Sequence, residues 1–365
     1  MTQTAIPYYF FRGGSSRGPY FKRSDLPASQ DALSAVLVAA LGSGHPLNID
    51  GLGGGNAVTT KVAMLSKSED DWADVDYYFA QVGVENRLVD YKPSCGNILV
   101  GVGPAAIEMG LMEAKDGVTD VKIHAINTGS KVVAQIQTPG GVVNYEGNSA
   151  VDGVPGTAAP ITLKFMDVVG AVTDKFLPSG NLMDNINGID VTCMDVAMPM
   201  VIARAKDFGL TGYESQQELD ANKRFFQQME PIRLAAGKLM GMGDCHDSVI
   251  PKFGLVAPAA QGGSMAVRYF MPWTAHPTLA VTGSQCLAAC ALTPGTVADG
   301  LVSSSPISPT TIALEHPMGT MDVIVDYALD NEQFTHRSAG LTRTARKLAK
   351  GELFVPSAIW EPASV

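Results

Sequence analysis

The sequence predicts an α+β fold made of two similar halves, each with a mixed or antiparallel sheet around one apolar helix. Three observations indicate this class. Short segments rich in Val, Ile, Tyr and Phe follow one another along the chain, few helices separate them, and the same order of segments recurs in the second half. The 365 residues suffice for two domains at roughly 150 residues each, and 46% of them are apolar, enough for a sizeable core.

The predicted strands are bounded by turn residues. The first covers residues 7–11 and ends in a turn of glycine and serine at residues 12–16. Further strands are expected at residues 75–82, 121–126 and 131–138, where β-branched and aromatic residues are enriched. Strands at this density favour an α+β fold over alternating βαβ units.

Helices are predicted at residues 30–42, 96–111, 215–242 and 283–292. The second and the fourth are apolar on nearly every side. A helix of this kind is buried rather than exposed along one face. We therefore expect one such helix at the centre of each half.

An internal repeat relates the two halves. Lys61 and Phe79 are 18 positions apart, as are Lys252 and Phe270. In both places a small turn and an apolar helix follow, which is typical of a duplicated unit. The predicted halves are residues 1–184 and 185–365, with a C-terminal tail that packs back on the first half.

The charge pattern excludes several classes of function. The net charge is −10 at pH 7 and the 26 Lys and Arg residues are scattered, so the sequence lacks the basic stripe that binds nucleic acid or an anionic membrane surface. No apolar stretch approaches the about 20 residues that cross a bilayer, and the first residues do not read as a signal peptide. We expect a cytoplasmic protein whose five cysteines remain free thiols.

The turns before the two apolar helices are candidate anion sites. A helix N-terminus offers free backbone N–H groups and a partial positive charge, so two such ends facing one cleft would hold a di- or tricarboxylate. The alternative is that these turns only cap their helices. The candidate substrate-binding residues, in these and two glycine-rich turns, are Ser15, Ser16, Arg17, Asn56, Gly96, Asn97, Thr282, Gly283 and Ser284.

Lys61 and Cys95 are the candidate catalytic residues. Cys95 directly precedes Gly96, where a helix end favours the reactive thiolate; the alternative is a small buried cysteine. Lys61 begins an apolar strand, where desolvation favours the neutral amine that a general base needs; the alternative is a lysine whose stem lies on apolar surface. Their counterparts are Thr282, which cannot be a comparable acid or base, and Lys252, interpreted as a lysine of this last kind.

Other chemistry has less support. Residues 244–247, Asp-Cys-His-Asp, look like a metal cluster, but neighbours this close rarely share one ion and no second cluster has zinc-like spacing. The six histidines form no motif, and no Gly-x-Ser-x-Gly supports a serine hydrolase. We therefore expect no metal site.

Short motifs of glycine, polar and charged residues are spread over nearly the whole chain. They are residues 11–18, 49–54, 60–63, 79–82, 89–91, 94–97, 154–157 and 177–181. In this order they resemble the 2-methylaconitate isomerase family, which has the diaminopimelate epimerase-like fold of two pseudo-symmetric halves. The Ser-Ser-Arg of residues 15–17, where many members have Thr-Ser-Lys, is most similar to the 4-oxalomesaconate isomerases. Those enzymes belong to the 4,5-cleavage pathway for protocatechuate and gallate, which receives aromatics from lignin.

The resemblance implies isomerisation without a cofactor, by movement of a proton along an allylic system. Lys61 matches the lysine that is the family's leading candidate for the base, which removes a proton from carbon beside the double bond. Cys95 matches the cysteine that returns a proton at the other end or assists. Thr282, in place of the epimerases' second cysteine, argues against amino-acid racemisation. Arg17 stands where the family more commonly has lysine, and this difference affects which carboxylate of the substrate is bound.

The expected ligand is a small tricarboxylate or keto acid, with 4-oxalomesaconate as the expected substrate. No nucleic-acid or membrane partner is expected, and a homodimer is left open. Two other interpretations remain: a 2-methylaconitate cis-trans isomerase of the methylcitrate pathway with the same site, and a non-catalytic module that binds organic acids.

Overall fold

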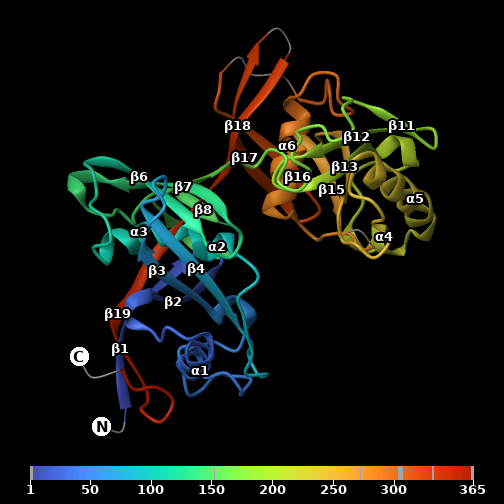
Figure 1. Cartoon of the computed structure of the whole chain (residues 1–365). Helices are drawn as coiled ribbons and strands as arrows, with labels where there is room; N and C mark the ends of the chain where they lie inside the picture. The colour runs from blue at the N-terminus through green and yellow to red at the C-terminus, as the bar shows by residue number, and fades with distance from the viewer. Residues whose placement is uncertain (1–2, 152, 272, 303–306, 331–332, 363–365) are drawn as a thin grey trace. The chain divides into compact units, whose positions relative to one another are not determined.

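The computed structural model describes residues 3–151, 153–271, 273–302, 307–330 and 333–362 (Figure 1). Contacts between residues divide the chain into two compact units. Unit 1 comprises Met1–Phe165 and Thr342–Val365, and unit 2 comprises Met166–Leu341. The boundary differs from the predicted one, since residues 166–184 belong to unit 2, whereas the last strand belongs to unit 1, where the C-terminal tail was expected to pack.

Unit 1 contains a mixed sheet. In it β19 pairs antiparallel with β1, β1 with β2, β3 with β4, and β6 with β7, whereas β2–β3 and β4–β6 are parallel. The predicted strand 75–82 is confirmed as β4, and the predicted strand 7–11 lies inside a longer β1. The elements are β1 (Gln3–Gly13), β2 (Ser16–Lys22), α1 (Gln30–Leu41), β3 (Lys61–Lys67), β4 (Val75–Val82), β5 (Val89–Asp90), α2 (Gly96–Val100), α3 (Val102–Glu108), β6 (Gly117–Ala125), β7 (Ser130–Thr138), β8 (Ser149–Val151), β9 (Val154–Ala158), β10 (Ile161–Met166) and β19 (Ala345–Pro356), with short 3₁₀ turns at Arg23–Asp25, Ala57–Thr59 and Pro139–Gly141.

The strands of unit 2 also pair in a mixed pattern. Here β12–β13, β14–β15, β16–β17 and β17–β18 are antiparallel, and β13–β14 and β15–β16 are parallel. The elements are β11 (Asp184–Ile186), β12 (Ile189–Asp195), β13 (Pro199–Arg204), α4 (Gln216–Ala221), α5 (Lys223–Leu239), β14 (Lys252–Pro258), β15 (Met265–Phe270), α6 (Val281–Leu292), β16 (Thr310–His316), β17 (Gly319–Asp330) and β18 (Gln333–Arg343), with a 3₁₀ turn at Ala205–Phe208.

The two units share one order of elements and of strand directions. The order in unit 1 is hairpin β1–β2, α1, hairpin β3–β4, helices α2 and α3, and hairpin β6–β7. The corresponding order in unit 2 is hairpin β12–β13, α5, hairpin β14–β15, α6 and hairpin β16–β17. Lys61 and Lys252 are the first residues of equivalent strands. The predicted match of Phe79 with Phe270 is wrong by one residue, because Phe79 pairs with the third residue of β3 whereas Tyr269 pairs with the third residue of β14.

The predicted helix 96–111 is broken at Gly101 into α2 and α3. Tyr20 donates its hydroxyl to the carbonyl of Ile98, which an unbroken helix would pair with Val102. Pro104 has no N–H for the carbonyl of Val100. The predicted helix 215–242 is likewise two helices, α4 and α5, because Asn222 leaves helical geometry and caps α5 by accepting from the N–H of Phe225.

The apolar helices lie in the cores, as predicted. Ile98, Leu99 and Val100 of α2 are buried with residues of β3, β4, β6 and β7 in the larger core of unit 1, and α1 covers a second core. In unit 2, α6 is buried from Gly283 to its end. It begins two residues earlier than predicted, at Val281, so Thr282 lies inside the first turn instead of before it.

Candidate functional site

Lys61 and Cys95 lie at the edge of the same core in unit 1. Successive residues of β3 face opposite sides of the sheet. Ala63 and Leu65 belong to the core around α2 and α3, so Lys61 faces that side as well. Cys95 is half-buried against this core and directly precedes α2. The structure therefore brings the two predicted catalytic residues to one side of the sheet.

Gln81 holds the amine of Lys61 in place. Lys61 Nζ donates to Gln81 Oε1 at 3.0 Å and lies 5.4 Å from the ring centre of Phe79. The amide nitrogen of Gln81 donates to the carbonyls of Ala57 (3.1 Å) and Thr60 (3.2 Å), which turns its oxygen toward the lysine. Lys61 forms no ion pair with the described residues, so its amine is held by a neutral partner.

Two buried tyrosines fix the first turn of α2. The hydroxyl of Tyr77 donates to the carbonyl of Cys95 at 3.4 Å, and that of Tyr20 donates to the carbonyl of Ile98. Burial raises the pKa of both phenols well above its usual value, and the neighbouring Cys95 raises it further. Both tyrosines therefore remain protonated donors. The ring centres of Tyr77 and Phe79 are 6.4 Å apart. A series of neighbouring side chains therefore leads from Cys95 through Tyr77 and Phe79 to Lys61.

The turn between β1 and β2 packs on α2. Asn97 Nδ2 donates to Ser15 Oγ at 3.1 Å. Gly14 has φ +50°, and a Cβ there would overlap the side-chain oxygen of Asn97. The neighbouring Ser16 is 3% exposed, and its hydroxyl has no hydrogen-bond partner in the described part of the chain. The turn thus places an unpaired hydroxyl beside the residues that follow Cys95.

Arg17 and Asn56 are engaged in other contacts. The guanidinium of Arg17 lies 5.6 Å from the ring centre of Phe10, whereas Phe11, on the other face of β1, packs in the core around α2. The Asn56 side chain accepts the N–H of Val58 at 3.1 Å and so caps a 3₁₀ turn. For Asn56 the capping interpretation fits the structure.

In unit 2 the predicted residues form the first turn of α6. Ser284 donates its hydroxyl to the carbonyl of Val281 at 2.8 Å and is buried. Gly283 lies directly under the ring of Tyr269, where a Cβ would overlap it. Thr282 is half-buried. The Ser284 hydroxyl is therefore engaged within the helix, which leaves Thr282 as the half-buried hydroxyl of this turn.

Residues 244–247 do not converge on one point. The Asp244 carboxylate accepts the N–H of His246 at 3.0 Å, and His246 pairs with Asp247 at 3.1 Å on the surface. Cys245 is buried beneath them and its thiol points to the carbonyl of Gly243 at 3.8 Å. Among the described residues no three His, Cys, Asp or Glu side chains gather as metal ligands.

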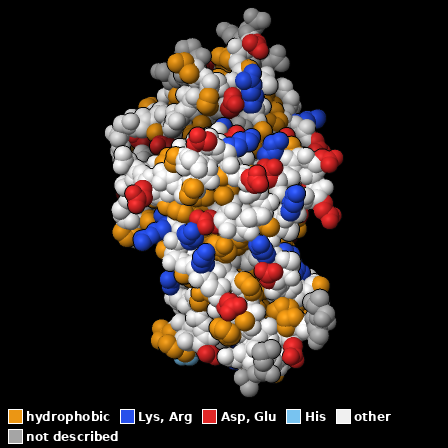
Figure 2. All heavy atoms as spheres, turned by 90° about the vertical axis from the view of Figure 1, so that its left-hand side faces the viewer, with side chains coloured by type: hydrophobic (Ala, Val, Ile, Leu, Met, Phe, Trp, Pro, Cys, Tyr) orange, Lys and Arg blue, Asp and Glu red, His pale blue; other side chains and the backbone are white. Residues whose placement is uncertain are grey.

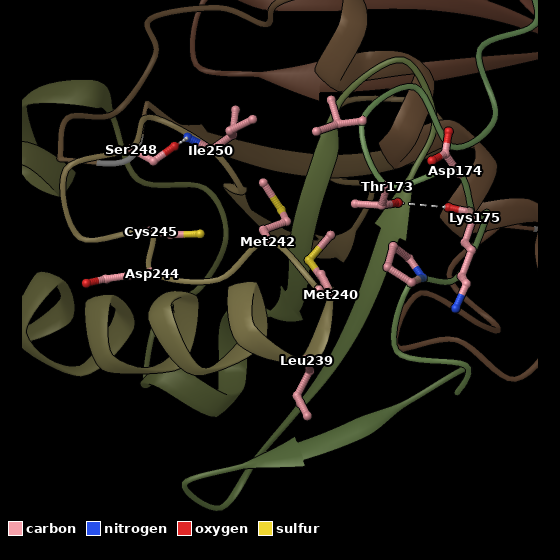
Figure 3. A pocket seen from close by; sticks show the side chains of 13 residues that line it. Thr173, Asp174, Lys175, Leu239, Met240, Met242, Asp244, Cys245, Ser248 and Ile250 are labelled. Carbon is pink, nitrogen blue, oxygen red and sulfur yellow. Dashed lines mark hydrogen bonds between the residues drawn. The ribbon is translucent and has the colours of Figure 1, made fainter.

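A pocket of about 570 Å³ opens in unit 2 beside these residues (Figure 3). It lies between a loop at residues 172–178 and the loop at residues 239–250 that leads into β14. In the view of Figure 3, Met240 and Met242 lie between Cys245 on one side and Thr173 on the other. None of the predicted site residues lines it.

Among the described residues, no helix is long and apolar enough to cross a membrane. Figure 2 shows acidic and basic side chains interspersed over the visible face, without a basic stripe.

Gln81 and Tyr77 were not predicted as site residues from the sequence. The sequence does mark Gln81 as a candidate, since its side chain is the one amide in an otherwise largely apolar strand. The sequence does not mark Tyr77 in this way, because nothing local distinguishes its hydroxyl from that of any other buried tyrosine.

Comparison with known proteins identifies the family. The model of the family described as "PrpF protein" matches residues 3–356. "Putative isomerase YbhH" of Escherichia coli K12 and "(4E)-oxalomesaconate Delta-isomerase" of Novosphingobium sp. KA1 are each 46% identical over 351 residues, covering 96% of this chain and 99% and 98% of theirs. The crystal structure of a methylitaconate-delta-isomerase is 31% identical, covers 100% of this chain and 99% of its own, and superposes with a TM-score of 0.89. The chain therefore belongs to the PrpF protein family of isomerases.

Proposed function

We propose that this chain is a cofactor-independent allylic isomerase of 4-oxalomesaconate. The observation that carries the proposal is the common placement of Lys61 and Cys95 at the edge of the core around α2. The substrate assignment is supported by the relative named for oxalomesaconate isomerisation and by the Ser-Ser-Arg of residues 15–17. YbhH is equally similar and its name specifies no substrate, so the substrate needs a direct assay.

The proposed reaction moves one proton along three carbons. The amine of Lys61 takes a proton from the carbon beside the double bond, breaking a C–H bond and leaving a dienolate conjugated with the keto acid. The thiol of Cys95 then donates its proton at the far end, which forms the new C–H bond and shifts the double bond. The lysine proton returns to the thiolate through solvent, so the cycle closes without net oxidation or reduction.

The developing negative charge needs fixed donors rather than a cofactor. The unpaired hydroxyl of Ser16 and the backbone N–H groups that follow Cys95 are the donors at hand in unit 1. Preorganised donors of this kind contribute about 3 to 4 kcal/mol each when they stabilise an oxyanion. We propose that Ser15 and Asn97 position this turn.

The shared order of elements supports a second part of the proposal. We propose that the two units arose by duplication, as in the diaminopimelate epimerase-like fold. Thr282 then stands where a two-thiol epimerase has its second cysteine, which leaves proton return to the single thiol of Cys95.

The purified protein tests the proposal with two acids in deuterated buffer. We expect 4-oxalomesaconate to change its ultraviolet absorbance and to acquire deuterium on carbon, because the thiol that donates to carbon exchanges its proton with solvent. Turnover of 2-methylaconitate alone would assign the other substrate. Binding of both acids without deuterium uptake would identify a binding module and contradict the proposal.

A further inference from the structure

Three arginines of unit 1 lie side by side on adjacent strands. β1 pairs with β2 on one side and with β19 on the other (Figure 1), and Arg12 of β1 lies directly opposite both Arg17 of β2 and Arg346 of β19. Residues directly opposite each other share one face of a sheet, with their Cβ atoms about 5 Å apart. Because Arg346 is distant from the other two in the sequence, this cluster exists only in the folded sheet.

The cluster lies on the other face of the sheet from the candidate catalytic residues. Arg17 and Phe21 share one face of β2, because side chains alternate along a strand. Phe21 belongs to the core that α1 covers, whereas Lys61 and Cys95 lie at the edge of the core around α2. An anion bound by the arginines is therefore separated from the proposed reaction by the sheet itself.

The three guanidiniums have no carboxylate partner in the described part of the chain. Arg12 donates only through Nη1, to the carbonyls of Gly14 and Thr344 at 2.9 Å each and to Thr344 Oγ1 at 3.1 Å. Its Nε and Nη2 have no partner among the described residues. Burial first and the neighbouring Arg346 second lower the pKa of Arg12. Like charges directly opposite each other destabilise a sheet, and an anion bound between them removes that repulsion.

The glycine-rich segment 51–55 borders the cluster at Arg17. A Cβ on Gly54 would lie 2.8 Å from Arg17 Nη2, so glycine lets the backbone come close to the guanidinium. The same guanidinium lies 5.6 Å from the ring centre of Phe10, a contact that favours one orientation of the side chain. Arg17 and Arg346 are exposed and Arg12 is half-buried, so a ligand can reach all three from solvent.

We propose that Arg12, Arg17 and Arg346 bind a phosphate group, either free phosphate or a phosphate ester. A phosphate group carries up to about two negative charges and has three acceptor oxygens, whereas a carboxylate carries one charge and has two oxygens. Each guanidinium presents a rigid fork of N–H donors that matches this geometry. The site is independent of the proposed isomerisation, and it assigns Arg17 to a phosphate rather than to a carboxylate of the substrate.

Calorimetric titration of inorganic phosphate into the full chain, at constant ionic strength, tests the site. We expect Arg346→Gln to bind phosphate about 10- to 100-fold more weakly, the loss expected for a hydrogen bond between charged groups. Arg17→Gln should weaken binding in the same range. The matched control is Lys350→Gln, which removes the same charge from the same strand. Lys350 lies opposite Tyr9, which packs on the core around α2, so this variant should bind phosphate like the unmodified chain.

The melting temperature separates binding from a structural role of Arg346. Without ligand, Arg346→Gln should melt at a higher temperature than the unmodified chain, because the substitution removes the like charge beside Arg12. Excess phosphate should raise the melting temperature of the unmodified chain more than that of the variant. A lower melting temperature of the variant without ligand, together with unchanged phosphate affinity, would assign Arg346 to structure and contradict the proposal.

Two further ligands identify the chemistry that is bound. Glycerol 3-phosphate binding more tightly than inorganic phosphate would identify a phosphate ester as the ligand, and the reverse order would identify free phosphate; both agree with the proposal. Tricarballylate, a tricarboxylate, should bind Arg346→Gln and the unmodified chain alike. If Arg346→Gln weakens tricarballylate as much as phosphate, the cluster binds carboxylates and the phosphate assignment is wrong. Equal weakening of phosphate by Arg346→Gln and Lys350→Gln, or no saturable binding to the unmodified chain, overturns the site.

Discussion

Lys61 is the residue on which the proposed reaction depends most, because its amine is the base. Replacing it by alanine removes the base but little packing, because the side chain is half-buried at the start of β3. We expect Lys61→Ala to lower kcat by about 10²- to 10⁴-fold, with the melting temperature close to that of the unmodified protein. Lys67→Ala, at the exposed far end of the same strand, is the control and should retain full activity. Activity of Lys61→Ala within twofold of the control would contradict the assignment.

Cys95 should affect a different step from Lys61. In Cys95→Ser the weaker acid hinders proton return, yet Lys61 can still remove the first proton. We expect product formation to fall by about 10- to 100-fold, while the substrate continues to exchange hydrogen for deuterium at the carbon beside the double bond. Nuclear magnetic resonance of the substrate in deuterated buffer measures both rates. Parallel loss of exchange and of product would mean that the two residues do not act on separate protons.

At the scale of elements, the contact between the β1–β2 turn and α2 should control the site. Gly14→Ala adds a Cβ where the Asn97 side chain lies, in addition to the strain of a positive φ. Gly129→Ala shares the positive φ but meets open space, so it isolates the strain of about 1 to 2 kcal/mol. We expect Gly14→Ala to lose more unfolding free energy in urea than Gly129→Ala, and to lose activity as well. Equal losses would show that the contact with Asn97 contributes nothing.

Local sequence patterns predicted single elements better than their contacts. The strand 75–82 and the position of Cys95 before a buried helix follow from residue types that act within a few positions. The break at Gly101 had a local signal in Pro104, which was passed over, but its second cause is the hydroxyl of Tyr20 from a distant strand, which no local pattern shows. Phe79 was matched to the wrong residue of unit 2 because counting along the chain does not fix the register between two strands.

The candidate site, too, could be predicted only in part, because local patterns do not show the contacts between segments that are distant in the sequence. The alternation of side chains along β3 shows which residues share a face of the strand with Lys61. Which of the two faces packs against α2 depends on the tertiary fold and could not be predicted from the sequence. Arg17 was grouped with Ser15 and Ser16 as neighbours in sequence, yet its guanidinium packs on Phe10, on the other face of β1 from Phe11 and α2. The pairing of Lys61 with Gln81 depends on the register of β3 and β4.

At the scale of the whole molecule, one half-buried histidine should make stability depend on pH. His336 in β18 has both ring nitrogens buried without a hydrogen-bond partner among the described residues, and burial lowers its pKa from 6.5 to about 4. Between these values the unfolded chain binds a proton that the folded chain does not. Stability therefore falls as the pH drops from 6.5 toward 4, by an amount on the order of 2 to 3 kcal/mol.

The variant His336→Phe removes this titration. Urea unfolding at pH 7 and at pH 4.5 should show a smaller loss of stability for His336→Phe than for the unmodified protein. His246→Phe, which replaces an exposed histidine of the same unit, should lose as much as the unmodified protein. An identical pH dependence for all three proteins would mean that His336 is protonated in the folded state.

The central claim is that the amine of Lys61 and the thiol of Cys95 act on one molecule. A crystal structure of the protein with tricarballylate tests it most directly. We predict a single bound acid with Lys61 Nζ and Cys95 Sγ each within about 3.5 Å of its carbon chain, at opposite ends of the bond that corresponds to the substrate's double bond. A well-ordered ligand that touches only one of the two residues, or that occupies the pocket between residues 172–178 and 239–250 instead, would contradict the claim.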